Sequence, residues 1–197
     1  MYLGNERKAF IEVARLVRIT TKMESDLERL GGVGNGIYEK YDSISHKFPK
    51  DFEKRLIEVA EARNKAVHDT PEIQNKEKIF HQSEVLEKML LWREEIERHA
   101  GEVQSIFEHQ KPCEADVWHR FMAEHKETID TLYAMEQDSR KHTFESWEQF
   151  MHEHLSEISP KIRRYRRRVK WRCLFKSPLF WGTIVLLVGI YVWQLGR

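Results

Sequence analysis

Apolar residues recur every three or four positions through most of the chain, which is the spacing of an amphipathic α-helix. The first such pattern runs from about Glu6 to Leu30, and the second from about Pro49 to His68. A third pattern begins at the start signal Thr70 and Pro71, and further helical patterns follow between about 114 and 158. Because strand-like alternation is almost absent, the pattern predicts an all-α fold.

The apolar positions of the first two helices predict the faces that they bury. In the first helix these positions are Phe10, Val13, Leu16, Val17, Met23, Leu27 and Leu30. In the second helix they are Phe52, Leu56, Val59, Ala60 and Val67. Four glycines between 31 and 36 separate the two patterns, and glycine there allows the positive φ angles that end a helix.

Four regions follow from these patterns. We expect a helical domain over 1–110, a helical extension or hairpin over 111–160, a basic segment over 161–176 and an apolar helix over 177–196. The boundary between the first two regions is placed at Lys111 and Pro112, where the long third pattern stops.

The last region has the character of a membrane anchor. No charged residue lies between Ser177 and Gly196, a length close to the shortest that crosses the hydrocarbon core. Cations are concentrated just before it, at Lys161, Arg163, Arg164, Arg166, Arg167, Arg168, Lys170, Arg172 and Lys176. Positive charge stays on the cytoplasmic side, so we expect a tail-anchored, single-pass membrane protein with a cytoplasmic N-terminal domain. The alternative is a buried C-terminal core helix.

The basic segment 161–176 has two candidate partners. It can bind anionic lipid head groups, or it can bind RNA phosphates with release of counterions. Its position directly before the apolar stretch favours lipids. The net charge of +1 conceals this segment, because the rest of the chain is acidic.

Side chains suited to chemistry are concentrated between Glu61 and Asp69. Arg63 lies three residues after Ala60, on the apolar stripe of its helix, where an unpaired guanidinium is costly. Arg63 must therefore meet an acid, face a polar cleft or contact a second subunit. Asn64 and His68 are four residues apart and share one face of the helix.

These residues have a catalytic and a structural interpretation. Histidine transfers protons near neutral pH, and arginine binds phosphate and stabilises developing negative charge. RNA supplies its own nucleophile, the 2′-hydroxyl, so Arg63 and His68 can support RNA cleavage without a metal. In the structural interpretation, Arg63 pairs with Glu24 in the core, and His68 at the helix end interacts favourably with the dipole.

Two patches are similar to one branch of the HEPN superfamily, small helical domains in which a helix ends in Arg-Asn-x-x-x-His. That motif here runs from Arg63 to His68, and the glycine-rich turn before Ile37-Tyr38-Glu39-Lys40 also resembles that branch. The resemblance covers about 1–110 and does not extend to 111–197. It implies a metal-independent endoribonuclease in defence or toxin-like roles, with the Arg and His of two chains lining one cleft.

By the same resemblance, His68 is the general acid and base, Arg63 holds the phosphate, and Asn64 is a polar positioning residue. Other HEPN domains only bind or dimerise. We expect no cofactor and no metal site, because the closest histidine pair, His152 and His154, is splayed apart on a helix.

Two functions follow. The first is a membrane-tethered, homodimeric HEPN-type ribonuclease or RNA-binding effector. The second is a non-catalytic, membrane-anchored helical adaptor that recruits a cytosolic protein partner.

Overall fold

The computed structural model describes residues 2–69, 72–108, 115–155, 160–165 and 167. Its elements in chain order are α1 (Tyr2–Arg29), α2 (Gly36–Ser43), η1 (Ser45–Lys47), α3 (Phe52–His68), α4 (Lys76–Glu108), α5 (Ala115–Glu124), α6 (Lys126–Gln137), η3 (Ser139–Lys141), α7 (Phe144–Phe150) and η4 (Met151–Leu155). The described residues form helices and no strand, so the all-α prediction is confirmed.

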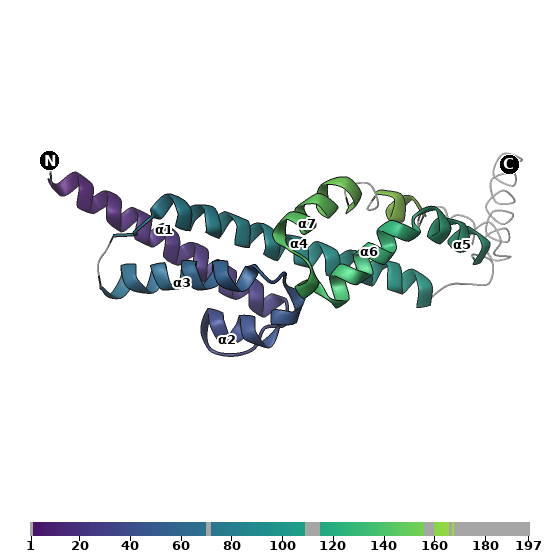
Figure 1. Cartoon of the computed structure of the whole chain (residues 1–197), viewed down its shortest axis with the longest axis horizontal. Helices are drawn as coiled ribbons and strands as arrows, with labels where there is room; N and C mark the ends of the chain where they lie inside the picture. The colour runs from purple at the N-terminus through teal and green to yellow at the C-terminus, as the bar shows by residue number, and fades with distance from the viewer. Residues whose placement is uncertain (1, 70–71, 109–114, 156–159, 166, 168–197) are drawn as a thin grey trace, which may run out of the picture.

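The molecule is elongated, and α4 runs along both of its halves (Figure 1). The first half of α4 packs with α1 and α3, while its second half packs with α6 and α7. The short helix α2 lies beside the first turns of α3 and packs on α1 (Figure 1). At 33 residues, α4 is about 50 Å long, which is long enough to contribute to two separate cores.

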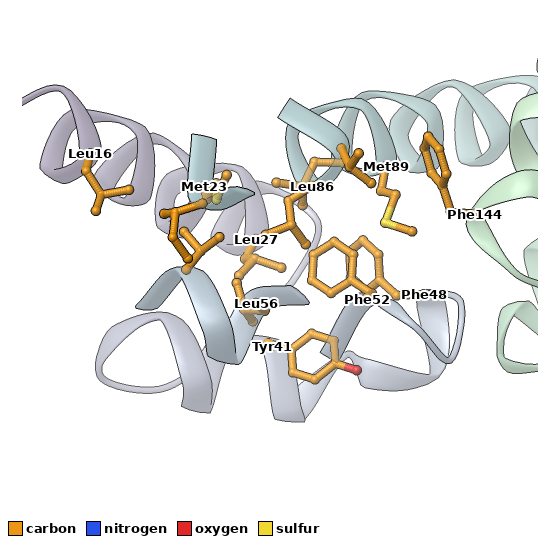
Figure 2. Close-up of a cluster of buried hydrophobic side chains, with 14 of the residues drawn as sticks. Leu16, Met23, Leu27, Tyr41, Phe48, Phe52, Leu56, Leu86, Met89 and Phe144 are labelled. Atoms are coloured by element: carbon orange, nitrogen blue, oxygen red, sulfur yellow. The ribbon is translucent and has the colours of Figure 1, made fainter. Parts of the chain in front are cut away.

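The first core forms where α1, α3 and α4 meet (Figure 2). Leu16, Met23 and Leu27 of α1 are fully buried at spacings of seven and four, as the apolar pattern of that helix predicts. Phe52 stacks on Phe48 with ring centroids 4.3 Å apart and on Tyr41 at 5.3 Å. Each such side chain contributes about 1.5–3 kcal/mol by burial, so this aromatic cluster fixes α2 and η1 against α3.

The glycine-rich turn allows α1 and α2 to approach closely. A Cβ on Gly32 would lie 2.7 Å from the carbonyl oxygen of Lys40 and 2.8 Å from that of Leu27, so no side chain fits there. Gly34 has a φ of +131°, which L side chains rarely adopt. The Glu39 side chain accepts a hydrogen bond from the Asn35 N–H at 2.7 Å and holds the turn against α2.

The second core lies between the second half of α4 and the helices that follow it. Its fully buried members are Ile96, Ile129, Leu132, Trp147 and Ile162. Trp92 packs against both cores, at the middle of α4. The two cores are therefore continuous along one helix and are not separated by a linker.

A buried arginine joins the two halves. Arg93 on α4 is 2% exposed, and its Nη1 donates to the carbonyls of Met135 at 3.4 Å and Glu136 at 3.2 Å and to Ser139 Oγ at 3.1 Å. These carbonyls belong to the last turn of α6, which has no further helical donors. The guanidinium therefore caps α6 from another helix and complements the negative end of its dipole.

A carboxylate balances this buried charge and extends the network. Glu97 Oε1 lies 2.9 Å from Arg93 Nη2 and 2.9 Å from Lys47 Nζ. Lys47 Nζ also donates to the carbonyl of Leu30 at 2.7 Å, just past the end of α1. One chain of charged hydrogen bonds thus connects the ends of α1 and α6 through α4.

The prediction of a membrane anchor is contradicted. In the part of the chain that the structure describes, no helix is both long and apolar enough to cross a membrane, because α1 and α4 carry charged residues throughout. Within the described residues, this finding contradicts the predicted transmembrane helix and the single-pass membrane localisation. The range 177–196, on which that prediction was placed, lies outside the described residues, as does most of 161–176.

Three local predictions also need correction. The sequence pattern places Phe10 on the buried face of α1 and Val67 on that of α3, yet their side chains are 62% and 44% exposed. For Phe10, the reason is that α1 projects past the end of α3 and the start of α4 (Figure 1), so its first turns have little to pack against. The helix expected from Thr70 and Pro71 begins at Lys76. The predicted boundary at 111–112 lies outside the described residues, and the domain division stays a prediction.

Replacing Arg93 should destabilise the fold strongly. We expect Arg93→Met to lower the free energy of unfolding by about 3–5 kcal/mol, because Glu97 and the end of α6 lose their buried partner. Arg98→Met is the matched control on the same helix: its side chain is 51% exposed, and its ion pair with Glu102 spans 3.8 Å. Urea denaturation followed by circular dichroism measures both; equal effects would show that Arg93 does not join the halves.

Two glycine-to-alanine changes should act in opposite directions. Gly32→Ala places a Cβ against two backbone carbonyls, so we expect a loss of at least about 1 kcal/mol of stability. Gly101 lies within α4, and a Cβ added there would meet nothing within 4 Å, so Gly101→Ala should stabilise by about 0.5–1 kcal/mol. Thermal unfolding of the two variants measures this, and a stabilising Gly32→Ala would contradict the close approach.

Candidate functional site

The last turns of α3 carry the three residues of the Arg-Asn-x-x-x-His motif. Phe52, Val59 and Ala66, spaced by seven, form the buried line of this helix at 0%, 0% and 4% exposure. Arg63 lies beside that line, about 60° from Ala66 on an ideal helix, and is half-buried. It is therefore an edge residue of the core, with its guanidinium within reach of solvent.

The predicted core ion pair of Arg63 is wrong. Glu24 pairs with Lys40 at 3.2 Å, and Lys40 also pairs with Glu28 at 2.9 Å. Arg63 instead donates from Nη1 to Asn64 Oδ1 at 2.9 Å. This bond to a neutral neighbour leaves the positive charge of Arg63 uncompensated by any carboxylate among the described residues.

His68 is the last residue of α3, and its side chain is exposed. It lies about 7.5 Å from Arg63 along the helix axis and about 140° around it, so the two side chains leave the helix in different directions. Asn64 shares a face with His68 and bonds to Arg63, and so stands between them. The structure thus brings Arg63 and Asn64 into contact, and the side chain of His68 makes no hydrogen bond to the described residues.

The surface around the motif is mixed in charge. Glu61 and Lys65 on the same helix are exposed beside Asn64. The Tyr38 hydroxyl of α2 donates to the Ile57 carbonyl at 3.4 Å, and partial burial and then the nearby Glu61 raise the pKa of Tyr38. Tyr38, Ile57 and Val67 are 40%, 38% and 44% exposed, so apolar side chains on α2 and α3 also reach this surface.

Two grooves lie at this end of the molecule. A groove of about 330 Å³ runs between α3 and the segment that leads into α4, and its lining includes Glu58, Glu61, Lys65 and Lys78. A larger groove of about 1130 Å³ lies between the first turns of α1 and residues 72–77. Neither lining includes Arg63, Asn64 or His68, and the side chains of Asn64 and His68 are exposed on the described chain.

A metal site is not formed by the described side chains. Within the described ranges, no group of three or more His, Cys, Asp and Glu residues is arranged to hold a metal ion. His154, half of the pair considered from the sequence, has a side chain outside the described part of the structure.

Sequence reasoning missed two buried ionisable residues on α4. Arg93 follows Leu90 and precedes Ile96 at helical spacing, so the argument applied to Arg63 would have found it. His99 is 2% exposed and follows Ile96 at the same spacing, although the sequence offers no metal or catalytic motif around it. Both residues serve the second core, and neither lies near the motif on α3.

No family model matches the chain, and no curated protein or solved structure matches it. The resemblance to the HEPN superfamily therefore still depends on the glycine-rich turn and on the motif from Arg63 to His68. It stays a prediction.

The stability of the fold should fall as the pH falls below 7. Burial, together with the adjacent Arg98 guanidinium at 3.0 Å, lowers the pKa of His99 despite Glu102 and Glu95 nearby. The unfolded chain then binds a proton near pH 6.5 that the folded chain binds only at lower pH, so acidification favours unfolding in that interval.

Urea unfolding at pH 7 and at pH 5.5 measures this effect. His99→Phe should flatten the dependence only in part, because burial also lowers the pKa of His142. An unchanged slope in His99→Phe would contradict a buried neutral His99.

Proposed function

We propose that this protein is a HEPN-type, metal-independent endoribonuclease that acts through Arg63, Asn64 and His68 on α3. The observation that carries the proposal is the state of Arg63. Its guanidinium makes no ion pair with any described carboxylate, and it is held by Asn64 at the edge of the core. A cation kept accessible in this way is suited to bind an RNA phosphate.

Each of the three side chains has its own role in the proposed cleavage reaction. His68 removes the proton of the 2′-hydroxyl, which attacks the adjacent phosphorus, and an imidazolium returns a proton to the departing 5′-oxygen. The products are a 2′,3′-cyclic phosphate and a 5′-hydroxyl. Arg63 binds the phosphate and stabilises the charge that builds up in the transition state, while Asn64 fixes the guanidinium.

A single chain supplies these groups on diverging sides of α3. The acid and the base of one reaction must both lie within hydrogen-bond reach of the reacting atoms. Two copies with their motifs facing each other would provide two histidines and two arginines around one phosphate, as the resemblance implies. Defence or toxin-like roles rest on that resemblance alone.

A second function, that of a non-catalytic helical adaptor, is supported by a different observation. Neither groove at this end of the molecule is lined by the motif, and apolar side chains of α2 and α3 are exposed. An open surface with exposed Tyr38, Ile57 and Val67 also suits recognition of a protein partner.

Cleavage of RNA by the full-length chain in EDTA distinguishes the two functions. We expect the native chain to cleave, and His68→Ala to reduce the rate by about 100-fold or more, since it removes the general acid and base. His81→Ala is the matched control, because His81 is an exposed histidine on α4 outside the motif. The readout is the rate of cleavage together with the chemistry of the 3′ ends.

Stability must be measured alongside. Because His68 and Asn64 are exposed, we expect alanine there to change the free energy of unfolding by no more than about 0.5 kcal/mol. A folded native dimer that leaves RNA intact would favour the adaptor, and equal cleavage by native and His68→Ala chains would rule out the proposed chemistry.

A further inference from the structure

One face of α3 connects the motif to the aromatic side chain of Tyr38. Four exposed residues follow one another along this face at spacings of four, three and four: Ile57, Glu61, Asn64 and His68. These spacings place them within about 60° of one another on an ideal helix. The Tyr38 hydroxyl of α2 donates to the carbonyl of Ile57, at the start of this face. Two residues of the motif therefore share a surface with a tyrosine from another helix.

The ring of Tyr38 is both oriented and accessible. Its hydroxyl reaches the Ile57 carbonyl at 3.4 Å, which sets the side chain against α3, and 40% of the residue is exposed. Partial burial, and then the Glu61 carboxylate, raise the pKa of Tyr38, so Glu61 lies near the ring. An exposed aromatic ring that is held in one orientation is suited to stack on an unpaired base of RNA.

The carboxylate of Glu61 is available to a ligand. It makes no hydrogen bond or ion pair with another described residue, and it also lines the smaller groove, so open space adjoins it. A carboxylate repels the phosphates of RNA, but it accepts hydrogen bonds from the donors of bases and sugars. Guanine is the base whose Watson–Crick edge carries two adjacent donors, N1–H and the N2 amino group, and one carboxylate can accept from both.

We propose that Tyr38 and Glu61 form a guanine-binding subsite beside the scissile phosphate. The base stacks on the Tyr38 ring, and Glu61 accepts from N1–H and the N2 amino group. The adjoining phosphate then lies near Arg63 and Asn64, since Glu61 and Asn64 are about 4.5 Å apart along the helix axis. The subsite names the substrate of the proposed function, unpaired RNA with a guanine next to the cleaved bond, and it rests on that function.

Binding of short oligonucleotides by the full-length chain tests the subsite separately from the cleavage chemistry. Fluorescence anisotropy is measured with three 2′-O-methyl tetranucleotides that lack the nucleophile. One contains only uridine, one contains a single guanosine, and one has inosine in place of that guanosine. We expect the guanosine strand to bind about tenfold more tightly than the uridine strand. The inosine strand should fall between them, because inosine keeps N1–H and lacks the amino group.

Substitutions at Tyr38 test the stacking contact. Tyr38→Leu should raise the dissociation constants of all three strands about tenfold, because it removes the ring. Tyr38→Phe keeps the ring and should restore binding to within about threefold of the native values. Circular dichroism checks that both variants are folded.

A substitution at Glu61 tests the hydrogen bonds to the base. Glu61→Gln should reduce the preference for guanosine over uridine to less than about threefold, because the amide turns a donor toward a donor of the base. The ratio of the two dissociation constants is the readout, since loss of the negative charge strengthens the binding of every strand. Glu77→Gln is the matched control, because Glu77 is an exposed glutamate in the first turn of α4, and it should leave the ratio unchanged.

Three results would overturn the subsite. The first is equal binding of the guanosine and uridine strands by the native chain. The second is a preference for guanosine that survives Glu61→Gln. The third is a native chain that binds none of the strands.

RNA cleavage separates the subsite from the proposed function. A preference for guanosine that depends on Glu61, in a chain that leaves RNA intact, would support the subsite and remove the ribonuclease. Cleavage that depends on His68 and is indifferent to the neighbouring base would support the ribonuclease and overturn the subsite.

Discussion

The buried guanidinium of Arg93 is the constraint on which the arrangement of this molecule depends. An arginine that is 2% exposed must have all of its donors satisfied, and Glu97, Ser139 and the last carbonyls of α6 provide the acceptors. Those acceptors come from different helices, so the charge is stable only when the helices are in their native places. The requirement fixes the second half of the molecule against α4 more specifically than apolar contact alone would do.

The bundle of α1, α3 and α4 is open at the end that lies far from this network. Lys47 and Glu97 hold the end of α1 and η1 against the middle of α4. At the opposite end, α1 runs past its neighbours and α3 ends with its polar residues exposed. Side chains that hold the fold together and side chains suited to chemistry are thus located at different ends of the bundle. Substitutions on the last turns of α3 can therefore change function with little effect on folding.

Much of the fold could be predicted from the spacing of apolar residues, because that spacing is a local property. The bounds of α1 and α3 followed from it within a few residues, as did the glycine turn between 31 and 36. The exposure of Phe10 could not be predicted in this way, since it depends on where α3 ends and α4 begins in space. The partner of Glu24 was also a matter of tertiary position: Lys40 on α2 reaches it, whereas Arg63 does not.

The fold does bury an arginine on a helical stripe, and it is Arg93, whereas Arg63, which the sequence pattern places on the stripe of α3, is half-buried. On the α4 stripe, Arg93 lies between Leu90 and Ile96 with partners more than 40 residues away in sequence. On the α3 stripe, Arg63 falls beside the buried line that ends at Ala66. A helical pattern locates a stripe, but it does not fix which edge residue the neighbouring helices cover. The membrane anchor was likewise predicted from local properties, namely hydropathy and flanking charge, alone.

The proposed function requires that RNA binds at the end of α3. Histidine side-chain NMR spectra of the full-length chain, titrated with a 2′-O-methyl oligonucleotide that lacks the nucleophile, test it most directly. We expect the imidazole resonances of His68 to shift on addition of the oligonucleotide, while those of His81 on α4 stay in place. An unaffected His68 while other histidines shift, or no moving resonance at saturating oligonucleotide, would contradict RNA binding at this surface.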